Sequence, residues 1–207
     1  MARAKQGDNA FIGIGIALLL FSPFLLLSIF KFYSLKNQYM SGKNYHRVID
    51  IGTLKQPLIA CAGLVFITYM AFAVTSGIHS SLGVATICVA AVVAFKMAQW
   101  VAVKYIGAII DADKKMIYFP PDMQSYGVED YLACKFLKDM STLDTVQIND
   151  IHKITRQAGK RLYLHGSFGS RAIVFSDKQK RDECMTAIQQ LAGKGVIMYE
   201  MEQSGYS

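Results

Sequence analysis

Long apolar stretches alternate with short polar segments along the first half of the chain. Three of these stretches are about 20 residues long, at residues 11–30, 58–76 and 82–103. About 20 apolar residues in a helix are enough to cross the hydrocarbon core of a bilayer, so the pattern predicts an integral membrane protein. With flanking residues, the expected transmembrane helices cover about 11–33, 57–76 and 82–103. Only residues 77–81 separate the second from the third, which predicts a tight antiparallel helical hairpin.

The first apolar stretch follows a short basic N-terminus, as the core of a signal peptide does. Its run of about 20 apolar residues exceeds the ~7 to 15 residues of a signal sequence, and no small-residue cleavage pattern follows it. Residues 31–36 (KFYSLK) instead place basic and aromatic side chains where a helix leaves the membrane. We therefore interpret this stretch as a retained helix with a kink at Pro23.

The charges divide the chain at about residue 104. Residues 1–104 carry nine Lys and Arg against two Asp, whereas the remaining residues carry thirteen basic and thirteen acidic side chains. The net charge of +7 therefore belongs to the membrane half, where Lys and Arg set helix orientation and meet anionic headgroups. No block of like charge typical of a nucleic-acid-binding tail occurs, so no nucleic acid is expected as a partner.

The distribution of basic residues also predicts the orientation in the membrane. Residues 31–55 hold five basic side chains against one Asp, and residues 77–81 hold no Lys or Arg. By the positive-inside rule, the 31–55 segment and the C-terminal half are cytoplasmic and the hairpin tip is outside. Three spans then place the N-terminus outside, against the weaker indication of Arg3 and Lys5. A re-entrant first stretch would return the N-terminus to the inside and leave the C-terminal half in the cytoplasm.

Lys96, in the third stretch, is the one charged residue within the three apolar stretches 11–30, 58–76 and 82–103. Ionisable groups inside a membrane are often functional. Lys96, however, lies within snorkelling reach of the interface that Trp100 and Lys104 mark. We interpret these three residues as interface anchors rather than as a transport or relay site. The same helix carries a small residue at every fourth position, a ridge for close helix packing or dimerisation: Ala90, Ala94, Ala98 and Ala102.

From about residue 105 the pattern is that of a water-soluble domain. Short β-rich runs at 106–111 and 116–119 predict a hairpin, and helical spacing in 127–139 predicts a short helical insertion. Alternation over 146–154, with further runs at 162–164 and 172–175, predicts an antiparallel meander.

An amphipathic helix is expected after the meander. Ser176 and Gln179 are spaced as a capping box at its start, and Gly193 and Gly195 are expected to end it. One core is expected to join the strands to this helix, from Ile148, Ile151, Leu162, Leu164, Ile173, Phe175, Ile188 and Leu191.

The run from residue 145 to residue 191, with TVQINDIHKI, RLYLHG, RAIVFSD and the terminal helix, resembles the bacterial pleckstrin-homology-like (PH-like) domains. The earlier segment IGAIIDADKKMIYFP is similar to the opening hairpin of such a domain, and many of these domains follow membrane anchors. The resemblance implies a small PH-like antiparallel β-barrel or meander that is capped by a C-terminal helix and used for binding. Together with the three N-terminal transmembrane helices, this predicts an α+β membrane protein. The expected parts are a transmembrane domain at 1–104, a PH-like domain at 105–193 and a tail at 194–207.

A cluster of basic residues falls on or beside the predicted hairpins: Lys153, Arg156, Lys160, Arg161 and Arg171. Eukaryotic relatives of the PH-like fold hold acidic lipid headgroups near such hairpins, so the cluster is a candidate lipid or partner site. The alternative is a solvated strand face, which the zero net charge of this half favours.

The sequence indicates no catalytic residues, metal or cofactor. It lacks GxSxG, Walker and HExxH motifs, and its four cysteines have no CxxC or Cys/His spacing. Cys184 falls on the expected buried face of the last helix, as a small core residue does. No enzyme is expected.

Two functional classes remain. The first is a membrane-anchored scaffold or regulatory protein at a bacterial inner membrane, whose cytoplasmic domain docks a protein partner or anionic lipid. Service as an accessory subunit of an envelope machine belongs to this class. The alternative is a small transport-related protein, in which a homo-oligomer of the transmembrane helices forms a conduit that the domain gates.

Overall fold

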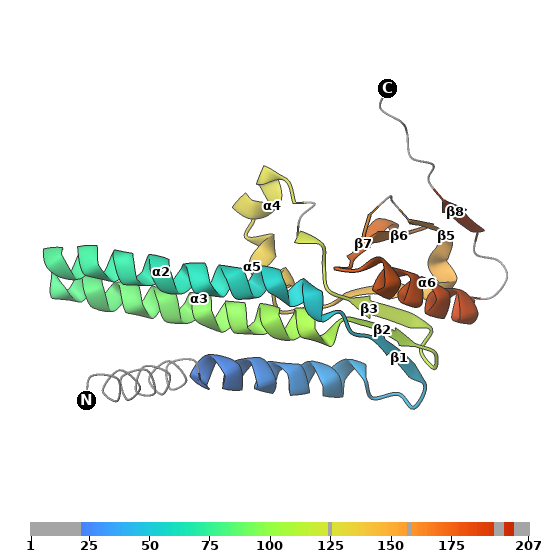
Figure 1. The fold of residues 1–207 in the computed structure, drawn as a ribbon, viewed down its shortest axis with the longest axis horizontal. Helices are drawn as coiled ribbons and strands as arrows, with labels where there is room; N and C mark the ends of the chain where they lie inside the picture. Colours follow the sequence, from blue (N-terminus) through green and yellow to red (C-terminus); the bar gives the residue numbers. More distant parts are fainter. Residues whose placement is uncertain (1–21, 124–125, 157–158, 193–196, 201–207) are drawn as a thin grey trace, which may run out of the picture.

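The computed structural model describes residues 22–123, 126–156, 159–192 and 197–200. The protein is of the α+β class, with long helices at one end and two β-sheets at the other (Figure 1). The chain begins its described part with a helix over residues 22–39. The predicted first span, about 11–33, lies partly outside the described residues.

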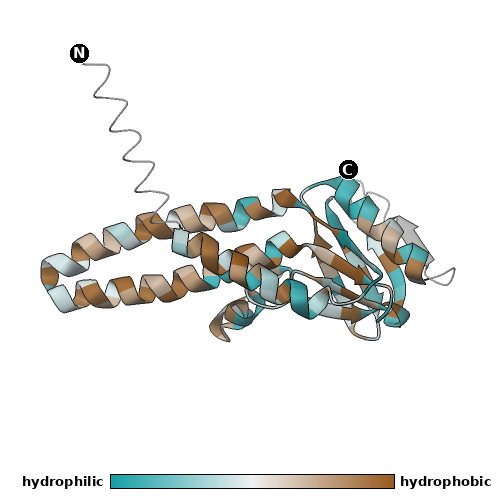
Figure 2. Ribbon diagram, turned by 90° about the horizontal axis from the view of Figure 1, so that it is seen from below, coloured by the Kyte–Doolittle hydropathy of each residue, from teal (hydrophilic) through white to brown (hydrophobic). Residues whose placement is uncertain are grey.

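The predicted helical hairpin is confirmed. It consists of α2 (Lys55–Ile78) and α3 (Ser80–Ile106), joined at His79. The hydroxyl groups of Thr75 and Thr86 hydrogen-bond across it at 3.0 Å. In the described part of the chain, two helical segments are long and apolar enough to cross a membrane, Ile51–Ile78 and Ser80–Ile106. Figure 2 shows hydrophobic residues around most of the hairpin surface.

The first sheet contains a strand that the sequence pattern did not reveal. The strand order is β1-β2-β3-β4, and all neighbours are antiparallel. These strands are β1 (Tyr45–Val48), β2 (Ala108–Asp111), β3 (Met116–Phe119) and β4 (Asp144–Gln147). Because β1 precedes the hairpin and pairs with β2, the hairpin is inserted between two adjacent strands. The sheet therefore includes residues that the expected 105–193 domain leaves out.

The second sheet has the order β7-β6-β5-β8. Its strands are β5 (Ile151–Arg156), β6 (Arg161–Gly166), β7 (Gly169–Val174) and β8 (Ile197–Glu200). The antiparallel meander of β5, β6 and β7 is confirmed, whereas β8 pairs with β5 in parallel. Residues expected in the tail thus include a strand. A closed barrel does not follow from these two separate sheets.

The continuous strand predicted over 146–154 is wrong. A 3-10 turn, η3 (Ile148–Asp150), separates β4 from β5 and passes the chain from the first sheet to the second. Ile148 and Ile151, on the two sides of this turn, are both buried in the core. The spacing of apolar residues is therefore the same as in one long strand and does not reveal the break.

Three further helices lie outside the hairpin: α4 (Val128–Leu132), α5 (Lys135–Asp139) and α6 (Lys178–Ala192). The first two confirm the predicted helical insertion. The capping box is wrong in detail, because Asp177 rather than Ser176 accepts from the backbone N–H of Gln179, at 3.1 Å. Gly193 and Gly195 lie outside the described residues.

The main core joins both sheets to α6 and includes all but one of the predicted core residues. The exception is Leu191, which is 40% exposed near the end of α6. Leu162, Leu164 and Ile188 are fully buried, and each such side chain stabilises the fold by about 1.5 to 3 kcal/mol. A second cluster packs Leu35, from the helix over 22–39, against Ile109 and Tyr118 of the first sheet.

Candidate functional site

A cavity of about 740 Å³ lies where the hairpin base meets the second sheet. We call it the junction pocket. Its walls come from the start of α2, the last turn of α3, the turn between β5 and β6, and the connection from β7 to α6. Each of the first three segments contributes basic side chains: Lys55, Lys104, and the pair Lys160 and Arg161.

The junction pocket has a strongly positive lining. None of its lining residues is acidic, and Thr53, Gln56 and Ser176 add neutral polar groups. Two carboxylates contact lining residues from behind: Asp122 lies 3.8 Å from Arg161, and Asp50 accepts hydrogen bonds from Gly52 and Ser176. A side-chain hydrogen bond with Tyr163 raises the pKa of Arg161, so this guanidinium stays charged. Among the described residues, no carboxylate forms an ion pair with Lys55, Lys104 or Lys160.

A buried carboxylate fixes one wall of the junction pocket. Asp50 is 7% exposed and precedes the 3-10 turn η1 (Ile51–Leu54), which leads into α2. It accepts hydrogen bonds from the backbone N–H of Gly52, at 3.1 Å, and from the backbone N–H and hydroxyl of Ser176. The start of α2 is thereby held against the start of α6.

Arg47 fixes the other end of the hairpin base. Its Nε and Nη2 atoms donate to the carbonyl oxygens of Ile106 and Tyr105, both at 2.8 Å, and so bind the last turn of α3. The guanidinium also lies 5.4 Å from the ring centres of Phe32 and Tyr105. Cations are stabilised at helix C-termini and over aromatic rings, so this one side chain joins β1, α3 and the helix over 22–39.

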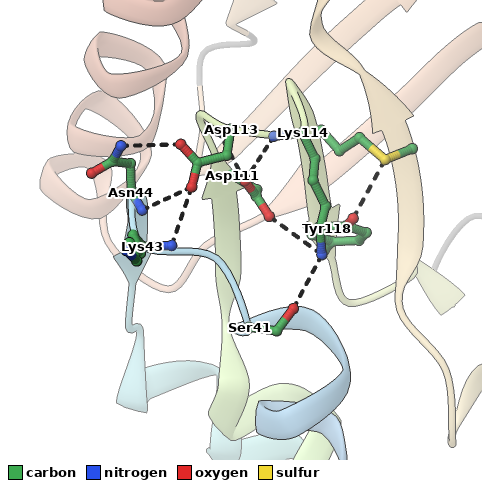
Figure 3. A network of polar contacts seen from close by, with 8 residues as sticks. Ser41, Lys43, Asn44, Asp111, Asp113, Lys114 and Tyr118 are labelled. Atoms are coloured by element: carbon green, nitrogen blue, oxygen red, sulfur yellow. Dashed lines mark hydrogen bonds and ion pairs between the residues drawn. The ribbon is translucent and has the colours of Figure 1, made fainter.

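A third set of contacts holds the segment before β1 (Figure 3). The Asp113 carboxylate accepts from the backbone N–H groups of Lys43 and Asn44, at 3.1 and 3.2 Å, and from the Asn44 amide at 3.0 Å. These hydrogen bonds lower the pKa of Asp113. Nearby, the Lys114 ammonium lies 3.7 Å from the fully buried Asp111 carboxylate and donates to Ser41.

The structure disperses the five basic residues predicted as one cluster. Only Lys160 and Arg161 line the junction pocket. Arg171 lines a polar cavity of about 500 Å³ between the α4–α5 insertion and β6–β7, which Arg161 also reaches. Arg156 pairs with Asp182 at 4.0 Å, and Lys153 is exposed on β5.

Two lysines of the junction pocket are not predicted as binding residues by the sequence pattern. It indicates Lys55 only as a basic loop residue and Lys104 only as an interface anchor. The one local indication of a shared site is that both lie at the base of the hairpin, Lys55 at the start of α2 and Lys104 near the end of α3. Their convergence with Lys160 depends on tertiary structure.

The small-residue ridge of α3 is increasingly buried toward the hairpin base. Ala98 and Ala102 are buried, whereas Ala90 and Ala94 are partly exposed. Ala102 borders an apolar cavity of about 180 Å³ that Ser28 and Phe32 of the helix over 22–39 also line. The ridge therefore packs within the chain at this end.

The other predicted anchors occupy different environments. Lys96 donates from Nζ to the carbonyl oxygen of Leu137 in α5, at 3.3 Å. Trp100 is partly buried, and its indole N–H finds no hydrogen-bond partner among the described residues.

The remaining titratable groups show no nucleophile or metal site. Burial raises the pKa of Cys184 to about 12, so its thiol stays protonated at neutral pH. Burial and the hydrogen bond to Asp139 raise the pKa of Tyr126. In the described part of the chain, no cluster of three His, Cys, Asp or Glu side chains is placed to hold a metal ion.

Comparisons with protein-family models, with curated proteins and with solved structures find no match for this chain.

Proposed function

We propose that the protein is a membrane-anchored binding or scaffold module, whose PH-like soluble domain holds an anionic group at the inner face of a bacterial cytoplasmic membrane. The junction pocket carries this proposal. Four basic side chains from three segments line one cavity that has no acidic lining residue. Such a cavity suits the phosphate of a lipid headgroup or an acidic segment of a protein partner.

The position of the junction pocket along the hairpin supports a membrane-surface role. At ~1.5 Å per residue, α2 extends about 36 Å, somewhat more than a hydrocarbon core of about 30 Å. With the His79 tip at one interface, the hairpin base reaches the opposite headgroup layer. Lys55 and Lys104 lie at this base and therefore at headgroup depth.

Charge and fold support the remaining parts of the proposal. Lys and Arg flank the hairpin base and are missing from residues 77–81, which favours a cytoplasmic base. The first apolar stretch serves as the third span of the anchor. Two sheets packed with α6 support the PH-like class, which binds partners and catalyses no reaction. Such a module fits an accessory subunit of an envelope machine.

Photocrosslinking in living cells tests the binding role. A photoreactive residue replaces Gln56, which lines the junction pocket, and in a matched variant it replaces Gln147, an exposed residue of β4 outside the pocket. We expect a discrete lipid or protein adduct at position 56 and none at position 147. Equal labelling at both positions would overturn the proposal, as would a purified homo-oligomer that conducts ions in vesicles.

Cysteine labelling tests the orientation. Cys134 is exposed between α4 and α5, and Cys88, the other exposed cysteine, is replaced by serine. We expect an impermeant maleimide to label Cys134 only after the cells are permeabilised. Labelling in intact cells would place the soluble domain outside.

A further inference from the structure

The α4–α5 insertion exposes apolar side chains that no described residue covers. Val128, Leu132 and Leu137 are 76%, 80% and 38% exposed. Val128 and Leu132 are four residues apart and lie on the same side of α4. Adjacent exposed apolar side chains of this size mark an interaction surface rather than an ordinary solvated helix.

The hydrogen bond between Lys96 and Leu137 places this insertion beside the hairpin. Lys96 Nζ donates to the Leu137 carbonyl oxygen at 3.3 Å, which links α5 to α3. Figure 1 shows α4 and α5 alongside the hairpin, and their charged side faces β6 and β7 across the polar cavity. No residue of the insertion belongs to the main core cluster.

The position of Lys96 along α3 sets the depth of the insertion. At ~1.5 Å per residue, Lys96 lies roughly 24 Å from Ser80, near the end of a hydrocarbon core about 30 Å thick. A lysine at this depth extends its ammonium toward the headgroups. Its acceptor, the Leu137 carbonyl, then lies at the boundary between acyl chains and headgroups.

The charged and the apolar side chains of the insertion lie on different sides. Its two lysines and two of its three acids, Asp130 and Asp139, line the polar cavity between the insertion and β6–β7. Lys135 pairs with Asp130 at 3.2 Å. The three exposed apolar side chains do not line that cavity. A segment with one charged and one apolar side is typical of the membrane interface.

We propose that the α4–α5 insertion is an interfacial membrane anchor, with Val128, Leu132 and Leu137 in contact with lipid. Its occupant is the leaflet in which the hairpin base ends, because the Lys96 contact places Leu137 at the depth of that leaflet's boundary between acyl chains and headgroups. The inference rests on the proposed function, which places the hairpin across a bilayer. It adds a contact that fixes the tilt of the soluble domain over the leaflet.

Fluorescence quenching in lipid nanodiscs tests this proposal with the full chain. Both exposed cysteines, Cys88 and Cys134, are replaced by serine, and an environment-sensitive dye is attached at Leu132→Cys. We expect lipids brominated near the top of the acyl chain to quench this dye at least threefold more than lipids brominated near the chain end. Aqueous iodide should quench it weakly. The dye at Val128→Cys should show the same quenching pattern, and it decides the outcome if the Leu132→Cys variant fails to fold.

Three control sites make the result decisive. The dye at Glu129→Cys, an exposed residue beside Val128, and at Ser167→Cys, in the turn between β6 and β7, should be quenched by iodide. The dye at Phe66→Cys, midway along α2, should be quenched by the deeply brominated lipid. If iodide quenches position 132 as strongly as position 167 while position 66 is in lipid, only the interfacial anchor is overturned. If position 66 is not in lipid, the transmembrane anchor fails and the interfacial anchor with it.

Discussion

The Asp50 carboxylate accepts hydrogen bonds from both the backbone N–H and the hydroxyl of Ser176, 126 residues later in the chain. Asp50 lies directly before the hairpin, and Ser176 lies directly before α6. The contact therefore links the helical hairpin to the helix that closes the core. It also forms one wall of the junction pocket, so the pocket depends on a bond between the two halves of the protein.

Replacing Asp50 should separate these two halves. Asp50→Ala leaves the donors of Gly52 and Ser176 without an acceptor, and each hydrogen bond to a charged group contributes about 1.5 to 3 kcal/mol. We expect the free energy of unfolding of the purified full-length protein to fall by about 2 to 4 kcal/mol, measured by denaturant titration. Glu129→Ala, which removes an exposed acid on α4, is the control and should change it by less than about 0.5 kcal/mol. Equal stability of the two variants would contradict the role of Asp50.

Gly52 tests the same contact through steric fit. A Cβ atom at this position would lie 2.0 Å from Ser176 Oγ and 2.5 Å from Ser176 Cβ, so one of the two segments must move. We expect Gly52→Ala to lower the thermal midpoint clearly. Gly63→Ala lies in the same helical segment, Ile51–Ile78, but has nothing within 4 Å of the added Cβ, so it should leave the midpoint unchanged or raise it. If Ser176 is the obstacle, Ser176→Gly should partly restore the Gly52→Ala variant.

The guanidinium of Arg47 should stabilise the fold through its two hydrogen bonds as well as through its charge. Arg47→Lys keeps the charge but loses the two parallel bonds to the last turn of α3, and we expect a loss of about 1 to 3 kcal/mol of stability. Lys43→Ala removes an exposed side chain from the same connection and serves as the control. Chemical unfolding in detergent checks both variants, and a lysine that substitutes fully for Arg47 would contradict the assignment.

Asp144 should make stability depend on pH. Burial raises its pKa in the folded protein, although Arg171 opposes the shift. The folded state therefore binds a proton more tightly than the unfolded state, and this group's contribution falls as pH rises through the raised pKa. We expect the gain in thermal midpoint from Asp144→Asn to be near zero below the unfolded pKa and to grow toward neutral pH. A constant difference from pH 3 to pH 8 would refute this.

The core assignment distinguishes two leucines that the sequence pattern treated alike. Leu164 is fully buried, so Leu164→Ala should cost about 2 to 5 kcal/mol of unfolding free energy. Leu191 is 40% exposed, and Leu191→Ala should cost less than about 1 kcal/mol. Denaturant titration of both variants decides whether α6 ends its core contact before Leu191.

The elements that could be predicted are those with a strong local signal. The hairpin follows from two apolar runs of spanning length with only five residues between them, and the meander follows from alternation and glycine-containing turns. The strand β1 has no such signal, because its four residues, YHRV, lie in a basic segment and three of them are polar. Its strand character comes from pairing with β2, which lies beyond the whole hairpin.

The junction pocket shows the same division. The sequence pattern groups two of its basic residues, Lys160 and Arg161, with Arg171, because all three fall on or beside consecutive predicted hairpins. Strand pairing turns Arg171 toward another cavity, while the fold brings Lys55 and Lys104 from the hairpin ends. Distance along the chain was a poor guide here because contacts between segments far apart in sequence decide which side chains converge.

The sequence by itself determined the helical hairpin, the α+β class and most of the core, since apolar periodicity and length are local properties of a chain. Tertiary structure alone decided where the hairpin is inserted, where the long strand breaks between two sheets, and which cations share a cavity. Those features depend on pairing between distant segments. The physical reason is that backbone groups in strands, and buried carboxylates such as Asp50, form hydrogen bonds with groups that the fold brings close, whatever their separation along the chain.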